Sequence, residues 1–171
     1  MLKAAIVMGS DSDLGVLSAA AAVLEQFGVP FEIQILSAHR TTEAALAFVS
    51  AAEKKGFGVV IAGAGAAAHL PGVLAAATPL PVIGVPVNAT PLAGMDALLS
   101  IVQMPPGIPV ATVGVNNARN AGLLAVQILS VKEKALRAKF KAYRETMKRE
   151  VLAKNARLGK IGFKKYLEEM K

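Results

Sequence analysis

Two adjacent side chains suited to anion binding and proton transfer lie in the segment SAHRTTE, residues 37–43. His39 is one of two histidines in the 171-residue chain, and Arg40 directly follows it. An arginine can bind a phosphate or carboxylate through two parallel hydrogen bonds, and a histidine exchanges protons near neutral pH. The pair predicts a site where Arg40 holds an anionic substrate while His39 moves a proton. An Arg–Asp ion pair beside a helix-capping histidine would fit the same residues equally well.

Two further segments have the composition of ligand-binding loops. GSDSD, residues 9–13, combines a glycine with two hydroxyls, which suits a phosphate or carboxylate site at a helix start and equally an ordinary helix cap. AGAGAAAHLPG, residues 62–72, has small residues that permit close approach of a planar ligand or tight packing of helix on sheet. Within this segment we favour a capping or carbonyl-bonding role for His69 over direct proton transfer.

These segments follow apolar runs that are typical of buried strands. The predicted strands cover residues 3–9, 31–37, 58–63, 81–87 and 109–115, and helical patterns lie between and after them. Because the runs are continuously apolar and alternate with helices, they predict an α/β fold with a parallel sheet covered on both faces. The carboxyl ends of parallel strands meet at one edge. We therefore expect five segments to converge there, namely 9–13, 37–43, 62–72, 87–96 and 114–120.

The last forty residues differ in character from the rest of the chain. Residues 1–131 hold five Lys/Arg and seven Asp/Glu, a net charge of −2, whereas residues 132–171 hold fourteen Lys/Arg and five Asp/Glu, a net charge of +9. A narrow apolar stripe at helical spacing predicts an amphipathic helix: Leu136, Phe140, Tyr143, Met147 and Val151. We divide the chain into an α/β catalytic domain, 1–131, and a basic helical extension, 132–171, that packs on the domain or on neighbouring subunits.

The composition argues against several classes of protein. The chain has no cysteine, so it has neither disulfides nor thiolate sites, and we expect no metal ligands. Its N-terminus does not read as a signal peptide and no apolar run approaches a membrane span, so we expect a cytoplasmic protein. The basic extension could bind nucleic acid, but a stripe-bearing helix with solvated cations is the favoured interpretation.

Five motifs together resemble one family: MGSDSD, SAHRT, IAGAGAAAHLPG, PVIGVPV and MPPGIPV, in this order within residues 1–131. They closely resemble the bacterial-type N5-carboxyaminoimidazole ribonucleotide mutases of purine (IMP) biosynthesis. The resemblance implies a flavodoxin-like three-layer α/β/α sandwich with C-terminal helices that reach neighbouring subunits of a homo-octamer. It also implies a cofactor-free conversion of N5-carboxyaminoimidazole ribonucleotide to 4-carboxy-5-aminoimidazole ribonucleotide.

The same resemblance assigns roles to individual residues of this chain. His39 would be the general acid–base, Ser10 and Arg40 would lie near the phosphate, and Asp13 would bind the ribose hydroxyls. Further residues would line the same pocket: Gly9, Ser12 and Ser37. Others would border the base and the migrating carboxylate: Ala64, Gly65, His69 and Leu70. The chain departs from the usual family residues at three positions that could alter the pocket's shape, namely Leu14, Thr42 and Ala66.

The implied reaction separates carboxyl transfer into two steps. His39 would protonate the carbamate nitrogen as carbon dioxide leaves, and C4 of the aminoimidazole would then attack the trapped gas and lose its proton to His39. Trapping keeps the gas at a high effective molarity. Two alternatives to this mutase remain: a direct aminoimidazole ribonucleotide carboxylase, and a nucleotide- or nucleic-acid-binding module without turnover.

Overall fold

Five parallel strands form one sheet in the computed structural model, which describes residues 1–170. The strand order is β2-β1-β3-β4-β5, and the strands are β1 (Lys3–Met8), β2 (Phe31–Ile35), β3 (Phe57–Gly65), β4 (Val82–Val87) and β5 (Ala111–Thr112). This order is that of flavodoxin-like sheets, in which the chain direction across the sheet reverses between β1 and β3. The predicted parallel α/β architecture is confirmed.

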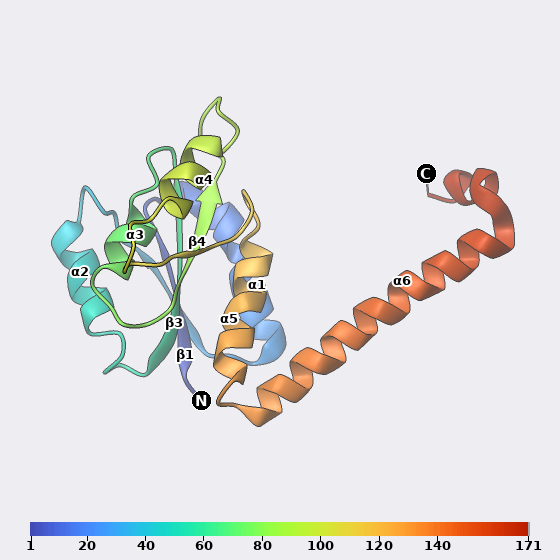
Figure 1. The fold of residues 1–171 in the computed structure, drawn as a ribbon, viewed down its shortest axis with the longest axis horizontal. Coiled ribbons are helices and arrows are strands. Elements are labelled where there is room, and N and C mark those ends of the chain that lie inside the picture. The colour runs from blue at the N-terminus through green and yellow to red at the C-terminus, as the bar shows by residue number, and fades with distance from the viewer. Residues whose placement is uncertain (171) are drawn as a thin grey trace.

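Helices cover both faces of the sheet and produce three layers (Figure 1). One face packs against α1 (Leu14–Phe27) and α5 (Ala118–Ser130). The other packs against α2 (Thr42–Ser50), α3 (Leu70–Ala75) and α4 (Met95–Val102). Successive residues of β1 point to opposite faces: Ile6 lies in the core beneath α1 and α5, and Val7 lies in the core on the other side. Both cores need apolar residues, so the strand is apolar from Ala4 to Met8.

The edge strand β5 is shorter than the sequence indicates. Residues 109–115 were expected to form it, and only Ala111–Thr112 have strand geometry. Pro109 lacks an N–H group for strand pairing. Beyond the strand, single backbone bonds still tie the chain to β4, from Val113 N to Gly84 O and from Asn116 N to Pro86 O. The segment therefore follows β4 without forming a regular ladder.

The C-terminal helix α6 (Lys134–Glu168) begins on the domain and then leaves it as an arm (Figure 1). Its first turns pack on α1, where the Phe27 ring lies 6.0 Å from Phe140 and 5.5 Å from Tyr143, between ring centroids. The helix breaks at Gly162, which has φ 75° and ψ 161°. Lys171, the last residue of the predicted extension, lies outside the described residues. Among residues 1–170, no helix combines the length and the hydropathy needed to cross a membrane.

Candidate active site

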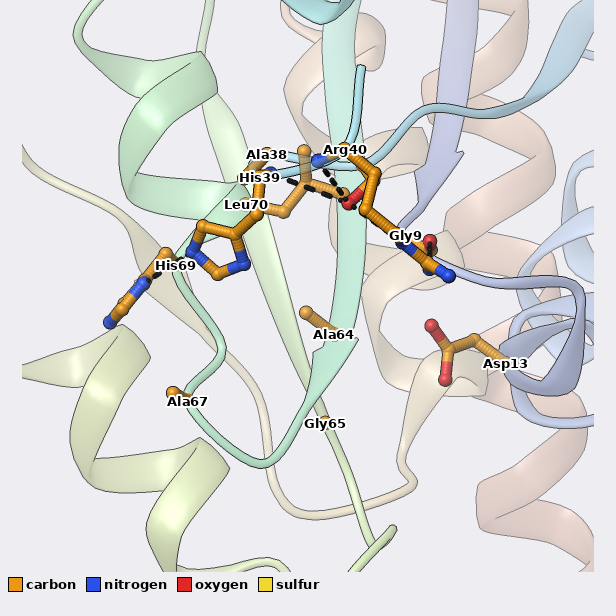
Figure 2. A pocket seen from close by; sticks show the side chains of 11 residues that line it. Gly9, Asp13, Ala38, His39, Arg40, Ala64, Gly65, Ala67, His69 and Leu70 are labelled. Atoms are coloured by element: carbon orange, nitrogen blue, oxygen red, sulfur yellow. Dashed lines mark hydrogen bonds between the residues drawn. The ribbon is translucent and has the colours of Figure 1, made fainter. Parts of the chain in front are cut away.

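A cavity opens at the carboxyl ends of β1, β2 and β3, where the sheet order reverses (Figure 2). Open α/β sheets bind ligands at this position because the loops on either side diverge and leave a crevice. Its volume is about 250 Å³. The lining residues come from three loops: Gly9, Asp13, Ser37, Ala38, His39, Arg40, Ala64, Gly65, Ala67, His69 and Leu70.

The loop after β2 is held in shape by the hydroxyl of Ser37. Its Oγ accepts hydrogen bonds from the backbone N–H of His39 at 3.3 Å and of Arg40 at 3.1 Å. The backbone N–H of Ser37 in turn donates to Thr41 Oγ1 at 2.8 Å. Thr42, one of the departures from the family residues, donates through its hydroxyl to the carbonyl of Ala38 at 2.7 Å. These local bonds fix the backbone that carries the histidine and the arginine.

Arg40 turns from this loop toward the end of β1. Its Nη2 donates to the carbonyl oxygen of Gly9 at 2.8 Å, and its Nε approaches Ser37 Oγ at 3.4 Å. The four ion pairs found within residues 1–170 do not include Arg40, so the alternative of an Arg–Asp ion pair is wrong. The guanidinium is a cation at the cavity wall that no carboxylate neutralises within the described chain.

The two histidines lie side by side although they are thirty positions apart in sequence. His39 Nε2 and His69 Nδ1 are 2.8 Å apart, and the ring planes are nearly perpendicular, at 89°. The capping role favoured for His69 is wrong: it occupies the N-cap position of α3, but its side chain makes no capping hydrogen bond. The capping alternative for His39 also fails, because Thr41 is the N-cap residue of α2.

Asp13 supplies a carboxylate on the other side of the cavity. The residue is 6% exposed, and Figure 2 shows its carboxyl oxygens facing the cavity. Burial raises the pKa of the Asp13 carboxyl above its ordinary value of 3.8, and the negative charge of Asp11 adds to that effect. Backbone hydrogen bonds from Ser10 and Gly9 act in the opposite direction. A buried acceptor of this kind gains from a ligand that donates hydrogen bonds to it.

Ser10 and Ser12 lie in the turn beside the cavity and are not among its lining residues. Ser10 caps a short 3₁₀ helix, η1 (Asp11–Asp13), by accepting from the N–H of Ser12 at 3.3 Å. The Ser12 hydroxyl donates to Ser10 Oγ at 2.9 Å. The capping interpretation of GSDSD is therefore correct for Ser10, while Gly9 and Asp13 from the same segment do face the cavity.

Small and apolar residues from the end of β3 and the start of α3 form the third wall. Gly65 is required for packing, because a Cβ there would lie 2.6 Å from Ala89 Cβ and 3.1 Å from the carbonyl oxygen of Val87. The next residue, Ala66, has φ 53°, in the left-handed region that favours glycine. The turn at Ala66 directs the chain back across the cavity, so that His69 and Leu70 both reach its lining.

Three of the five segments expected to converge form this cavity, and the segments 87–96 and 114–120 contribute no lining residue. Sequence reasoning missed Ala38 and Ala67. The methyl side chain of an alanine gives no indication of a binding role. The one signal in the sequence was that both alanines lie inside candidate loops. Within residues 1–170, no cluster of three or more His, Cys, Asp or Glu residues has the geometry to hold a metal ion.

Comparison with known proteins agrees with the fold and with the motifs of these loops. The family described as AIR carboxylase matches residues 3–150. The N5-carboxyaminoimidazole ribonucleotide mutase of Thermotoga maritima is 56% identical over 169 residues, covering 99% of each chain. The phosphoribosylaminoimidazole carboxylase of Saccharomyces cerevisiae is 55% identical over 163 residues, which are 95% of this chain and 28% of the yeast protein.

A solved structure has the same architecture. The crystal structure of Treponema denticola PurE superposes with a TM-score of 0.83 at 30% sequence identity, covering 92% of this chain and 99% of that one. The family match spans most of the chain, and the Thermotoga relative is similar along its whole length. The chain therefore belongs to the AIR carboxylase family.

Proposed function

We propose that the protein is an N5-carboxyaminoimidazole ribonucleotide mutase, which moves a carboxyl group from N5 to C4 of the substrate. One observation supports this assignment: His39 and Arg40, from one hydrogen-bonded loop, flank a cavity with a buried carboxylate opposite and small apolar residues between. This arrangement suits a substrate with an anionic end, hydroxyl groups and a planar ring. The mutase relative from Thermotoga, 56% identical, supports the same reaction.

The phosphate and ribose of the substrate would occupy the side of the cavity near β1. Arg40 is an unpaired cation within the described chain and would bind the phosphate, with Ser10 beside it in the adjoining turn. Asp13 would accept hydrogen bonds from the ribose hydroxyls, because its carboxyl oxygens face the cavity. The remaining contacts would come from Gly9, Ser12 and Ser37.

The aminoimidazole ring and its carboxylate would lie against the opposite wall. Ala64, Gly65 and Leu70 present little polar surface there, and His69 closes the end of the wall. An apolar surrounding solvates a carboxylate poorly, which favours loss of carbon dioxide. It also holds the released gas next to C4 without a competing hydrogen-bonding partner, so that recapture precedes escape.

His39 would perform both proton transfers. As the N5–carboxyl bond breaks, the electron pair of that bond stays on N5 and His39 protonates this nitrogen, releasing carbon dioxide. C4 then forms the new carbon–carbon bond, and His39 removes the C4 proton. The protein ends the cycle with the protons it began with, and the substrate's C4 proton has been exchanged for one on N5.

A direct carboxylase is the second candidate, which would add carbon dioxide from solution to aminoimidazole ribonucleotide. The 55% identity to the yeast phosphoribosylaminoimidazole carboxylase favours it. The two activities differ in the source of the carbon dioxide: the mutase releases it in the cavity from N5 of its own substrate, and the carboxylase takes it from solution.

The reverse reaction separates the two candidates. Purified protein is supplied with 4-carboxy-5-aminoimidazole ribonucleotide in bicarbonate-free buffer, and products are resolved by rapid chromatography. Formation of N5-carboxyaminoimidazole ribonucleotide identifies the mutase. Accumulation of aminoimidazole ribonucleotide alone, above the uncatalysed rate, identifies the carboxylase. Neither product forming would contradict both candidates and leave a binding module.

We further propose that the chain functions as a homo-oligomer, an octamer by resemblance, in which residues 132–171 contact a second copy. Two apolar stripes support this. On α6 the stripe that begins at Phe140 continues past the domain through Met147 and Val151, which are exposed. On α4 a second stripe at helical spacing is also exposed, formed by Met95, Leu99 and Val102, and the exposed Leu92 lies in the turn just before the helix. Exposed apolar stripes of this kind are typical of subunit interfaces.

A further inference from the structure

The catalytic candidate His39 has two ring nitrogens, and the structure gives them different surroundings. Nε2 is 2.8 Å from His69 Nδ1. Figure 2 shows the other nitrogen, Nδ1, on the side of the ring that faces the cavity and Ala64. Within residues 1–170, Nε2 has the one hydrogen bond found for this ring. One nitrogen is therefore engaged by the protein, and the other is exposed to a bound substrate.

Both rings are carried by backbone that is held on either side. The backbone N–H of His39 donates a hydrogen bond to Ser37 Oγ at 3.3 Å. On the other loop, the His69 N–H donates to the carbonyl of Ala67 at 2.8 Å, and the next residue, Leu70, is buried with 2% exposure. The contact between the rings thus joins two loops that are each fixed locally, and Ala66, with its left-handed backbone, directs the second loop toward the first.

A hydrogen bond between two ring nitrogens needs one N–H group between them. If His39 donates, its Nε2 carries the hydrogen, and the neutral ring presents a lone pair at Nδ1, toward the cavity. If His69 donates, the neutral His39 ring presents Nδ1–H instead and has no lone pair there. The direction of this bond therefore decides whether the neutral form of His39 is a base toward the substrate.

We propose that His69 is a positioning residue that accepts a hydrogen bond from His39 Nε2–H, so that Nδ1 is the nitrogen that moves the proton. The proposal rests on the proposed function, which requires His39 to give a proton and later take one back. With His39 as donor, Nε2–H persists in the cation and in the neutral ring, and the bond to His69 is unchanged through the cycle. With His69 as donor, the bond would have to reverse at each transfer.

Protons balance in this scheme without a further group. The His39 cation releases the Nδ1 proton to N5 of the substrate as carbon dioxide departs, and the neutral ring keeps Nε2–H. The Nδ1 lone pair then accepts the proton from C4 after the carbon–carbon bond has formed, which restores the cation. His69 stays neutral throughout, accepting at Nδ1 and carrying its own hydrogen on Nε2. It contacts the catalytic ring and has no proton-transfer step of its own.

Two substitutions at one position test the acceptor role. His69→Leu removes the acceptor, and His69→Asn keeps one, because the asparagine amide oxygen can take the place of Nδ1. We expect His69→Leu to lower kcat about tenfold or more, as part of a general acid–base contribution of roughly 10²–10⁴, with KM changed less than about threefold. His69→Asn should recover most of that loss. Equal kcat values for the two variants would overturn the proposal, whether both are active or both impaired.

The tautomer of His39 can be observed in the unsubstituted protein, because the chain holds two histidines and the single-histidine variant His69→Asn identifies which signals belong to His39. Nitrogen-15 solid-state NMR of the histidine-labelled, unsubstituted protein should show the neutral His39 ring with hydrogen on Nε2 and a lone pair on Nδ1. A neutral ring with hydrogen on Nδ1 would contradict the assignment even if turnover is high. The spectrum needs no substrate, so it tests the tautomer of His39 independently of the reaction. The proposed reaction is tested separately, by the activity assay of the unsubstituted protein.

Discussion

The guanidinium of Arg40 is anchored to the carbonyl oxygen of Gly9, with Nη2 and the oxygen 2.8 Å apart. The contact joins the loop after β2 to the end of β1, which are neighbouring strands of the sheet. One terminal nitrogen is thereby committed to the protein, and the guanidinium plane is oriented before any ligand arrives. A planar cation that is already oriented loses less conformational entropy when it binds a phosphate or carboxylate.

Replacing Arg40 by lysine tests this orientation. Lysine keeps the charge but cannot hold Gly9 and bind an anion through a planar fork at once. We expect KM for the nucleotide to rise about tenfold to a hundredfold, as for loss of a charged hydrogen bond of roughly 1.5–3 kcal/mol, with kcat changed much less. Steady-state kinetics measure both quantities.

Arg137→Lys is the matched control, since Arg137 also bonds backbone carbonyls, of Ser130 at 3.0 Å and Val131 at 2.6 Å, far from the cavity in sequence and fold. Its substitution should lower thermal stability and leave KM unchanged. An equal rise of KM in both variants would show that Arg40 acts through general stability.

Replacing His39 by asparagine should abolish turnover while nucleotide affinity stays within about tenfold, because a positioned acid–base acts on the chemical step. Single-turnover assays and calorimetric titration with substrate or product measure the two effects separately. Near-normal turnover in His39→Asn would remove His39 from the mechanism.

The sheet could be predicted from sequence because each strand carries its own signal. Strands buried on both faces are apolar along nearly their whole length, and β3, β4 and the part of β1 after Lys3 show this pattern. The edge strand β5 carries a weaker signal, since two residues suffice for its pairing with β4. The apolar segment 109–115 was therefore predicted as a longer strand than the chain forms.

The contact between His39 and His69 could not be predicted from sequence. Each histidine is compatible with local roles, and the bond between them depends on the register of β1, β2 and β3 and on the turn at Ala66. That turn places a non-glycine residue at φ 53°, and no local preference of alanine indicates such a conformation. The sequence predicted that an amphipathic helix forms in residues 132–171. It did not predict that this helix, α6, leaves the domain after Tyr143.

Asp13→Asn should stabilise the protein at neutral pH and weaken substrate binding. Burial raises the pKa of the folded Asp13 carboxyl above its ordinary 3.8, so the folded state binds the proton more tightly than the unfolded state. The stability of the unsubstituted protein therefore falls as pH rises from the unfolded pKa to the folded one. Thermal unfolding across pH should show the advantage of Asp13→Asn absent near pH 3 and growing above it. An advantage independent of pH would contradict this account.

Gly122→Ala should destabilise the contact between α1 and α5. A Cβ at this position would lie 2.9 Å from the carbonyl oxygen of Ala20 and 2.9 Å from Val23 Cβ, so the two helices must separate, at about 1–3 kcal/mol. Gly159→Ala is the control: nothing lies within 4 Å of its Cβ, and the better helix former should add roughly 1 kcal/mol. Denaturant unfolding measures both changes, and destabilisation by Gly159→Ala would indicate a contact at that position that a single copy lacks.

The exposed part of the α6 stripe should hold subunits together. Val151 is 64% exposed and Leu158 is 40% exposed in the single chain, and both follow Met147 on one side of the helix. Replacing both by aspartate would bury carboxylates in the proposed interface, so we expect light scattering to report a smaller assembly. Ala153→Asp introduces the same group on the opposite side of the helix and should leave the mass unchanged. An unchanged mass in the double variant would show that the arm is not an interface, whereas dissociation of both variants would place contacts on more than one side of the helix.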